Sequence, residues 1–261
     1  MNSNVVINDL VGFKNLKIIQ NKEYFNFSLD SVLLPNFIHF NKSINMIMDI
    51  CTGNAPIPLI MSTKTNSKII GVEIQNEIYD LAKKTVELNH LENQIQLIHD
   101  DANNLIDYYE SDTFDIITCN PPYFRVNEKS LRNDNEVKCN ARHETLINLE
   151  QIIKIARKLL KNKGSLYIVH RTERLSEIMY LMKRNNIEPK RVRFVYPKQG
   201  TESNIVLIEG KKDGNLGLKV ETPLIAHNED GSYSAEVLKM FEWSRWLQCC
   251  KKVIMEKMRY I

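Results

Sequence analysis

The sequence predicts an α/β fold built on one mostly parallel sheet with helices on both faces. From about residue 45 to residue 185, short apolar runs alternate with amphipathic segments, which is typical of a doubly wound sheet. Polar residues stand where several of these runs end, and ligands bind at that edge of an open α/β sheet. The 261 residues suffice for one large domain, and a hydrophobic content of 43% supports a substantial core.

The composition limits the binding partners and the cellular compartments that suit this protein. The net charge of +3 comes from 35 basic and 32 acidic residues, so any surface that binds nucleic acid must be local. Five cysteines without a C-x-x-C pair argue against a disulfide framework and a zinc site, and favour a reducing cytoplasm. No apolar run reaches the roughly 18 residues of a membrane-spanning helix, and the N-terminus has no signal-peptide core. We expect a cytoplasmic monomer with no metal and no membrane partner.

The first part of the chain is expected to lead into the sheet. Residues 1–24 are polar and mixed, which favours a short strand or hairpin. A helix follows, and Ser28 or Asp30 could cap its N-terminus. Its apolar side consists of Val32, Leu33, Leu34, Phe37 and Ile38.

Residues 45–62 predict a strand, a small-residue loop and a helix, which is the shape of a turn that holds a nucleotide. Gly53 is the only glycine of the loop, which argues against a dinucleotide pyrophosphate site. An acid at the end of the strand suits a positively charged group instead. We therefore expect Asp49 to hold, directly or through water, the ammonium of an amino-acid moiety.

The next two strands also end in acids. Residues 68–74 form the first of them, and Glu73 lies 20 residues after Gly53, the distance at which a carboxylate binds ribose hydroxyls. After a helix over 76–89, a third strand over 95–98 leads to Asp101. This residue could accept a hydrogen bond from the amino group of an adenine. Alternatively, Asp100 or Asp101 caps a helix that begins at Ala102.

The fourth strand, Phe114–Ile117, leads to the stretch Thr118-Cys119-Asn120-Pro121-Pro122-Tyr123-Phe124. Two prolines force the chain out of the sheet in a stiff, extended conformation. The Asn120 side chain and the Pro121 carbonyl then provide two fixed acceptors, which suit a group with two donors, an NH2. Tyr123 and Phe124 add flat faces for an aromatic ring. The alternative is a Pro-Pro turn with two core aromatics.

The rest of the chain completes the sheet. Residues 125–143 are charged and non-periodic, and we expect a mobile lid or substrate loop there. His143 and His170 are expected to be surface or packing histidines, since neither shows metal-ligand spacing. The remaining elements expected are helices over 146–160 and 174–185, a strand over 164–169, and an antiparallel pair over 191–196 and 204–209.

Over about residues 25–210 the sequence resembles the class I S-adenosylmethionine-dependent methyltransferases. Its Asn-Pro-Pro-Tyr motif is similar to those of enzymes that methylate an amino group conjugated to a π system: adenine N6, cytosine N4 or a glutamine amide. Within these it resembles the bacterial tRNA1(Val) (adenine-37 N6)-methyltransferase family. The matching stretches are residues 27–34, 49–54, 120–124, 141–144 and 223–225.

The resemblance implies a Rossmann-like fold with a seven-stranded sheet, S-adenosylmethionine as cofactor and tRNA as partner. Asn120, Pro121, Pro122 and Tyr123 would hold the target adenine. Ala55 departs from the family pattern, which usually has a second glycine there. The residues implied to line the cofactor are Phe27, Asp30, Asp49, Cys51, Gly53, Asn54, Ala55, Glu73, Ile74, Asp101, Ala102 and Asn120.

Alternative functions share part of this pattern. A DNA adenine methyltransferase usually needs a separate target-recognition domain, for which there is little room. A protein-glutamine N5-methyltransferase normally carries a helical domain ahead of the cofactor loop, and only about 45 residues precede it here. A non-catalytic RNA-binding module is a third possibility, although Asp49, Glu73 and Asn120 are all present.

Basic residues outside the sheet are expected to contact RNA. We divide the chain into a methyltransferase domain, 1–235, and a basic amphipathic helix, 236–261. From residue 237 onward the charge is +4, and this helix either grips RNA phosphates, packs on the core or lies on a membrane surface. The expected RNA contacts are Phe124, Arg125, Arg142, His143, Lys251, Lys252, Lys257 and Arg259.

Overall fold

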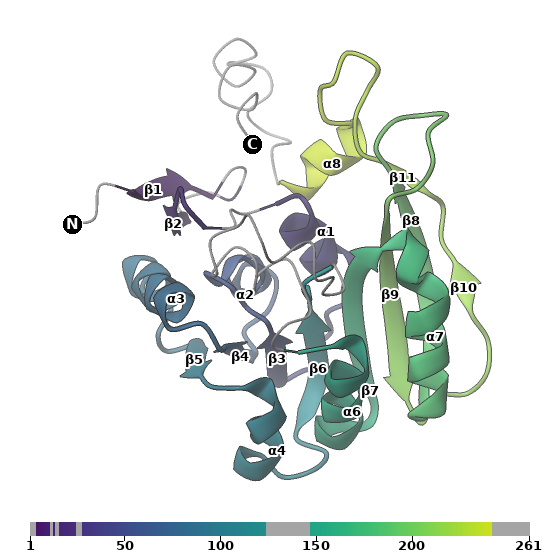
Figure 1. Ribbon diagram of the computed structural model, residues 1–261, viewed down its shortest axis with the longest axis horizontal. Coiled ribbons are helices and arrows are strands. Elements are labelled where there is room, and N and C mark those ends of the chain that lie inside the picture. The colour runs from purple at the N-terminus through teal and green to yellow at the C-terminus, as the bar shows by residue number, and fades with distance from the viewer. Residues whose placement is uncertain (1–3, 11–12, 14–15, 25–27, 124–146, 242–261) are drawn as a thin grey trace, which may run out of the picture.

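A nine-stranded sheet forms the centre of the part of the chain that the computed structural model describes, which is residues 4–10, 13, 16–24, 28–123 and 147–241. The strand order is β10-β8-β9-β7-β6-β3-β4-β5, with β11 also paired to β8 (Figure 1). Strands β3 to β7 are parallel, and β9 runs antiparallel between β7 and β8. The strands are β3 (Met46–Ile50), β4 (Lys68–Glu73), β5 (Ile95–His99), β6 (Phe114–Cys119), β7 (Leu160–Arg171), β8 (Ile187–Tyr196), β9 (Ile205–Lys212), β10 (Lys219–Val220) and β11 (Leu224–Ile225).

Helices cover both faces of this sheet and create two hydrophobic cores. One core joins the sheet to α1 (Asp30–Phe37), α2 (Pro56–Ser62), α3 (Asn76–Leu88) and α8 (Ala235–Met240). The other joins it to α4 (Leu105–Tyr108), α6 (Leu149–Leu159) and α7 (Leu175–Arg184). Within β3, Ile47 belongs to the first core and Met48 to the second, because successive side chains of a strand point to opposite faces.

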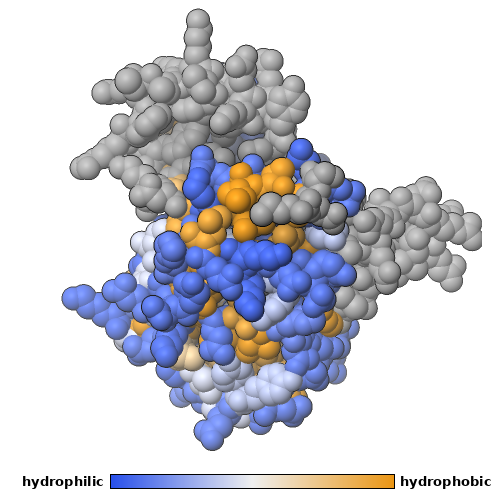
Figure 2. Space-filling model, turned by 90° about the vertical axis from the view of Figure 1, so that its left-hand side faces the viewer, coloured by the Kyte–Doolittle hydropathy of each residue, from blue (hydrophilic) through white to orange (hydrophobic). Residues whose placement is uncertain are grey.

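The N-terminal hairpin consists of β1 (Val5–Asp9) and β2 (Lys17–Asn21), paired antiparallel as the sequence predicts. It packs on α3, where the Ile19 N–H donates to Thr85 Oγ1 at 3.1 Å. Figure 2 views the molecule from the side on which this hairpin lies, and polar residues cover most of that face. Within the described ranges, no helix combines the length and the apolar character needed to cross a membrane.

Most predicted elements agree with the structure within a few residues, and the differences have local causes. Neither Ser28 nor Asp30 caps α1: its N-cap is Leu29 without a side-chain bond, and Asp30 is the first helical residue. The predicted sheet of seven strands gains β10 and β11, which cover the edge of β8 that would otherwise remain unpaired. A capping box between Asn148 and Gln151 starts α6.

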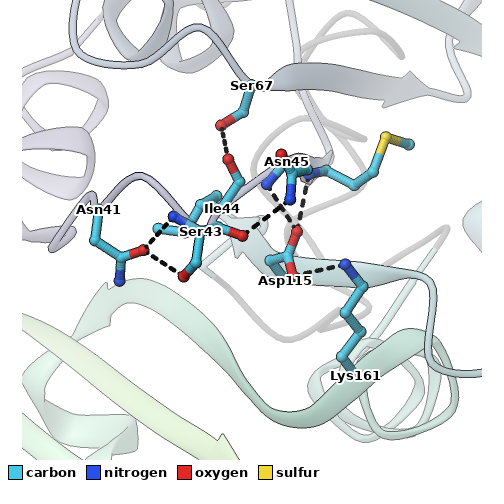
Figure 3. A network of polar contacts seen from close by, with 8 residues as sticks. Asn41, Ser43, Ile44, Asn45, Ser67, Asp115 and Lys161 are labelled. Carbon is cyan, nitrogen blue, oxygen red and sulfur yellow. Dashed lines mark hydrogen bonds and ion pairs between the residues drawn. The ribbon is translucent and has the colours of Figure 1, made fainter.

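A polar network fastens the sheet at the edge where β3 and β6 begin (Figure 3). Asp115 Oδ2 accepts hydrogen bonds from the N–H groups of Asn45 and Met46 at 2.9 and 3.0 Å. Its Oδ1 accepts from Lys161 Nζ at 2.7 Å, so one carboxylate joins β3, β6 and β7. Burial opposes ionisation of Asp115, but Lys161 and the two N–H groups outweigh it and hold the pKa below its usual range.

Replacing Asp115 with alanine should lower the free energy of unfolding near neutral pH by about 2 kcal/mol, because three donors lose their acceptor. Since the folded-state pKa is depressed, this contribution is present above the unfolded-state pKa of about 3.9 and is lost as the pH falls through the folded-state value. Urea unfolding near neutral pH and at about pH 3 measures both effects.

The matched control is Asp9→Ala, which removes an exposed ion pair with Lys17 and should cost less than about 1 kcal/mol. Equal losses of stability in the two variants would contradict the role assigned to Asp115.

Candidate active site

A cavity of about 390 Å³ opens at the carboxyl ends of β3, β4, β5 and β6. All four strand-end segments singled out in the sequence meet there, because the carboxyl ends of parallel strands share one edge of the sheet. The walls are formed mainly by residues 51–54, 73–75, 100–102 and 120–123. Residues from the hairpin region, α1 and β7 complete them.

The loop after β3 turns sharply at left-handed residues. Cys51, Gly53 and Ala55 have φ angles of 60°, 58° and 69°. Gly53 borders the cavity, and a Cβ added to it would meet no atom within 4 Å, so the space beside this backbone is open. Ala55 is fully buried and begins α2; a left-handed conformation costs alanine about 1 kcal/mol, which glycine avoids. This explains why glycine suits that position.

Glu73 ties the loop after β3 to the end of β4. Its Oε2 accepts from the Gly53 N–H at 3.0 Å, and its Oε1 accepts from the Gln75 N–H at 2.9 Å. The residue is only 6% exposed yet lines the cavity. Burial raises the pKa of this carboxyl, and the backbone hydrogen bonds oppose that shift. The Glu73 carboxyl is therefore suited to accept hydrogen bonds from the hydroxyl groups of a ligand.

Asp49 lies beneath the cavity floor, fully buried. Its Oδ1 accepts from Thr118 Oγ1 at 2.6 Å and its Oδ2 from Thr52 Oγ1 at 2.7 Å. Burial raises its pKa to about 7, against the effect of the two hydroxyls. Neither Asp49 nor Ala55 is on the cavity wall, so their expected part in cofactor binding stays a prediction. Asp49 supports the cavity wall from behind, and the two hydroxyl groups satisfy both oxygens of its carboxyl.

Apolar side chains line much of the cavity. They include Ile74, Ala102 and Ile147, together with residues of α2 and α3 that sequence reasoning missed. Asp101 also lines the cavity, and its Oδ1 accepts from the Asn103 N–H at 2.8 Å. It therefore caps the short 3-10 helix Ala102–Asn104, as one of the two readings of the sequence predicts. That bond leaves the Oδ2 of Asp101 available to a ligand. The same geometry therefore also allows the alternative, in which Asp101 accepts a hydrogen bond from the amino group of an adenine.

A polar cluster of three residues lies on the cavity wall. The hydroxyl oxygen of Tyr123 lies 2.7 Å from Asn120 Oδ1 and 2.7 Å from Asp30 Oδ2. One hydroxyl proton cannot serve both acceptors. A protonated Asp30 resolves this, since its carboxyl can donate to Tyr123 while Tyr123 donates to Asn120. Burial raises the pKa of Asp30, which is 8% exposed, and so favours that arrangement.

The ring of Tyr123 is held by two residues of β7. The guanidinium carbon of Arg171 lies 5.7 Å from the ring centroid, and the His170 ring lies at 5.1 Å. His170 is fully buried, a packing histidine as the sequence predicts, and burial lowers its pKa to about 4. Arg171 lines the cavity and was missed. It ends the strand next to β6, so applying the strand-end rule to β7 would have found it.

Nine of the twelve residues expected to line a cofactor are on the cavity wall, as are Pro121, Pro122 and Tyr123. Several expected site residues lie outside the described residues: Phe27, Phe124, Arg125, Arg142, His143, Lys251, Lys252, Lys257 and Arg259. The same holds for the expected loop 125–143 and for the expected helix beyond residue 241. Within the described part of the chain, no cluster of three or more histidine, cysteine or acidic side chains is arranged to hold a metal.

Known proteins resemble this chain in sequence and in fold. Two curated relatives named tRNA1(Val) (adenine(37)-N6)-methyltransferase come from Aliivibrio salmonicida and Cytophaga hutchinsonii. The first is 25% identical, covering 82% of this chain and 87% of the relative. The second is 24% identical, covering 88% and 95%.

Two solved structures share the fold. A protein from Agrobacterium tumefaciens, described as a predicted O-methyltransferase, has a TM-score of 0.66 and 16% identity, covering 82% of this chain and 95% of its own. The hMettl16 catalytic domain in complex with MAT2A 3'UTR hairpin 1 has a TM-score of 0.56 and 22% identity, covering 80% and 78%. Both confirm the Rossmann-like α/β fold. The family model described as the methyltransferase small domain matches residues 30–185, more than half of the sequence. The chain therefore belongs to the methyltransferase small domain family.

Proposed function

We propose that this protein methylates the N6 amino group of adenine in tRNA, with adenine 37 of tRNA1(Val) as the target and S-adenosylmethionine as the donor. The observation that carries the proposal is the position of Asn120 and Pro121 on the wall of a cavity whose other walls suit an adenosine. The names of the curated relatives support the same substrate. We place the activity in the cytoplasm, because five cysteines without a C-x-x-C pair favour a reducing compartment.

The cavity has the chemistry that the donor requires. Its volume of about 390 Å³ falls within the usual range of ligand pockets, roughly 300–1,000 Å³. Glu73 offers carboxylate oxygens to ribose hydroxyls, and Asp101 offers its Oδ2 to an adenine amino group. Ile74 and Ala102 provide apolar surface for the adenine ring. S-adenosylmethionine, when bound, supplies a methyl group carried on a positively charged sulfur.

Asn120 and Pro121 would prepare the nitrogen that receives the methyl group. The lone pair of adenine N6 is delocalised into the ring, so this nitrogen is a poor nucleophile. Hydrogen bonds from its two hydrogens to Asn120 Oδ1 and the Pro121 carbonyl favour a pyramidal nitrogen with a more available lone pair. Positioning and electrostatic stabilisation then supply most of the acceleration. A strong general base is unnecessary because the nitrogen becomes acidic once it is methylated.

Tyr123 and Asp30 would fix the direction in which Asn120 presents its amide. The Tyr123 hydroxyl holds Asn120 Oδ1 from one side, and an amide oxygen has a second lone pair for the substrate. Asp30 in turn holds the Tyr123 hydroxyl. Arg171 lies over the Tyr123 ring, so a target base that stacks on Tyr123 would use the opposite ring face. Stacking of this kind contributes roughly 1–3 kcal/mol per base.

Substitution of Asn120 tests this chemistry most directly. Asn120→Ala should reduce methyl transfer by about 10³-fold or more, because the acceptor for the amino group is lost. Tyr123→Phe should give a smaller loss, since it keeps the Asn120 acceptor and removes the hydroxyl that orients it and contacts Asp30. Mass spectrometry of nucleosides from tRNA incubated with enzyme and donor measures N6-methyladenosine. Calorimetry should show donor affinity within a few-fold of wild type in both variants, whereas full activity of Asn120→Ala would sink the mechanism.

The Glu73 carboxylate should determine the affinity for the donor. Glu73→Gln should weaken binding of S-adenosylmethionine by roughly 10- to 100-fold, the usual loss for a hydrogen bond to a charged group. Glu77→Gln, an exposed change on the neighbouring helix α3, is the control and should bind as wild type does. Calorimetry measures both affinities. An unchanged dissociation constant in Glu73→Gln would reduce Glu73 to a residue that only shapes the loop.

Asp49 should produce two pH effects of opposite sign. Its folded-state pKa of about 7 exceeds the unfolded-state value of about 3.9, so the free protein should lose stability as the pH rises between these values. As the pH rises through about 7, the side chain of the folded protein becomes a carboxylate, so affinity for the positively charged donor should rise. Asp49→Asn should flatten both profiles, measured by urea unfolding and calorimetry. The exposed substitution Asp107→Asn should leave both as in wild type, and pH profiles that survive in Asp49→Asn would refute the assignment.

A further inference from the structure

A second groove lies at the opposite edge of the sheet from the candidate active site. It has a volume of about 790 Å³ and is bordered by the beginnings of β6 and β7, part of β8, the end of β9 and the beginning of β10. Asn41, Ser43, Asp115 and Lys161, labelled in Figure 3, belong to its lining. The groove therefore includes part of the polar network around Asp115 that holds the start of β3 in place.

Five lysines line this groove. Lys161 pairs with Asp115, and the other four lie one on each of four neighbouring strands. Lys219, Lys190, Lys211 and Lys163 belong to β10, β8, β9 and β7, in the order in which these strands lie side by side (Figure 1). Neighbouring strands are about 4.8 Å apart, so the row extends over roughly 14 Å. The antiparallel direction of β9 brings the end of that strand to the edge where the others begin.

The charges of these four lysines are not neutralised by acids. In the ranges that the structure covers, none of the four forms an ion pair with a carboxylate. Lys190 Nζ donates to the Asn215 carbonyl at 2.9 Å, and Lys163 Nζ donates to the Asp213 carbonyl. Lys211 Nζ donates to the Lys163 carbonyl at 3.5 Å. Neutral carbonyls thus hold three of the ammonium groups without cancelling their charge.

The acids in the lining already have partners. Asp115 pairs with Lys161 at 2.7 Å, and Glu209 pairs with Arg191 at 2.8 Å. Six basic and two acidic side chains give the lining a net charge of +4, whereas the whole chain carries +3. The positive charge of the protein is therefore concentrated in this groove rather than spread over its surface, apart from the C-terminal segment.

We propose that this groove binds the phosphate backbone of the substrate RNA at a distance from the target base, an inference that rests on the proposed function. A single small anion would be held by one or two lysines, whereas a row of four suits successive phosphates. Lysine neutralises phosphates as a point charge without reading sequence. β6 separates the two edges by about 20 Å, the length of six residues, or roughly six nucleotides of a stacked strand. A folded RNA whose target base occupies the cavity is therefore long enough to reach both of these edges of the sheet.

The test compares two variants that lose the same charge. Lys211→Gln/Lys219→Gln removes two groove lysines, and Lys83→Gln/Lys84→Gln removes two exposed lysines of α3 that have no ion pair in the described part of the chain. Fluorescence anisotropy measures binding of unmodified tRNA at several salt concentrations, without methyl donor. The groove variant should bind several-fold to tenfold more weakly. Its plot of log affinity against log salt should be shallower by about 1.4–1.8, because each lost phosphate contact removes roughly 0.7–0.9.

The remaining readouts separate this inference from the proposed function. In the groove variant, kcat at saturating tRNA should equal wild type and KM for tRNA should rise, with the melting temperature and donor affinity unchanged. Wild-type tRNA affinity and salt dependence in that variant, or equal losses in the α3 variant, would overturn the groove while leaving methylation intact. Tight tRNA binding by a wild-type protein that forms no methyladenosine would instead overturn the proposed function. Calorimetry with inorganic phosphate tests whether the groove is instead a site for a small anion. If the groove variant loses phosphate binding but keeps wild-type affinity for tRNA, the groove is not an RNA site.

Discussion

The buried carboxyl of Asp49 is the interaction on which the rest of the site depends. It joins Thr52 at the start of the loop after β3 to Thr118 near the end of β6. The first of these partners sets the loop that carries Gly53, and the second sets the strand that delivers Asn120. Two walls of the cavity are thus positioned by one residue that does not itself reach the cavity. Its burial costs free energy, and the two hydroxyl groups offset part of that cost.

Residues at strand ends could be predicted because their positions follow from local pattern. Glu73 ends an apolar run, and the place where a parallel strand ends fixes the edge at which its side chain is found. The bounds of α2, Pro56–Ser62, followed in the same way from a loop of small residues and a proline in the first turn. These features depend on neighbours within a few positions of the chain.

The features that sequence reasoning missed depend on partners far away in the chain. Asp30 was expected at the site, but its pairing with Tyr123, 93 residues later, could not be read from the sequence. Arg171 gains a place in the site only because β7 lies next to β6. The depth of Asp49 below the cavity also follows from packing rather than from its position in the sequence. In each case a local pattern admits several structures, and tertiary contacts select one.

The hairpin at the N-terminus gives the assembly of the cavity a definite order. Asn54 Nδ2 donates to the Ile19 carbonyl across 35 residues, and the N–H of Ile19 donates to Thr85 across 66 residues. The hairpin precedes α3 in the chain, so its docking surface exists only after α3 has been synthesised and packed. Contacts between distant residues carry the larger loss of chain entropy, so they form after local ones. The hairpin consequently reaches its final place only after α3 does, and the cavity wall to which Asn21 contributes is complete only then.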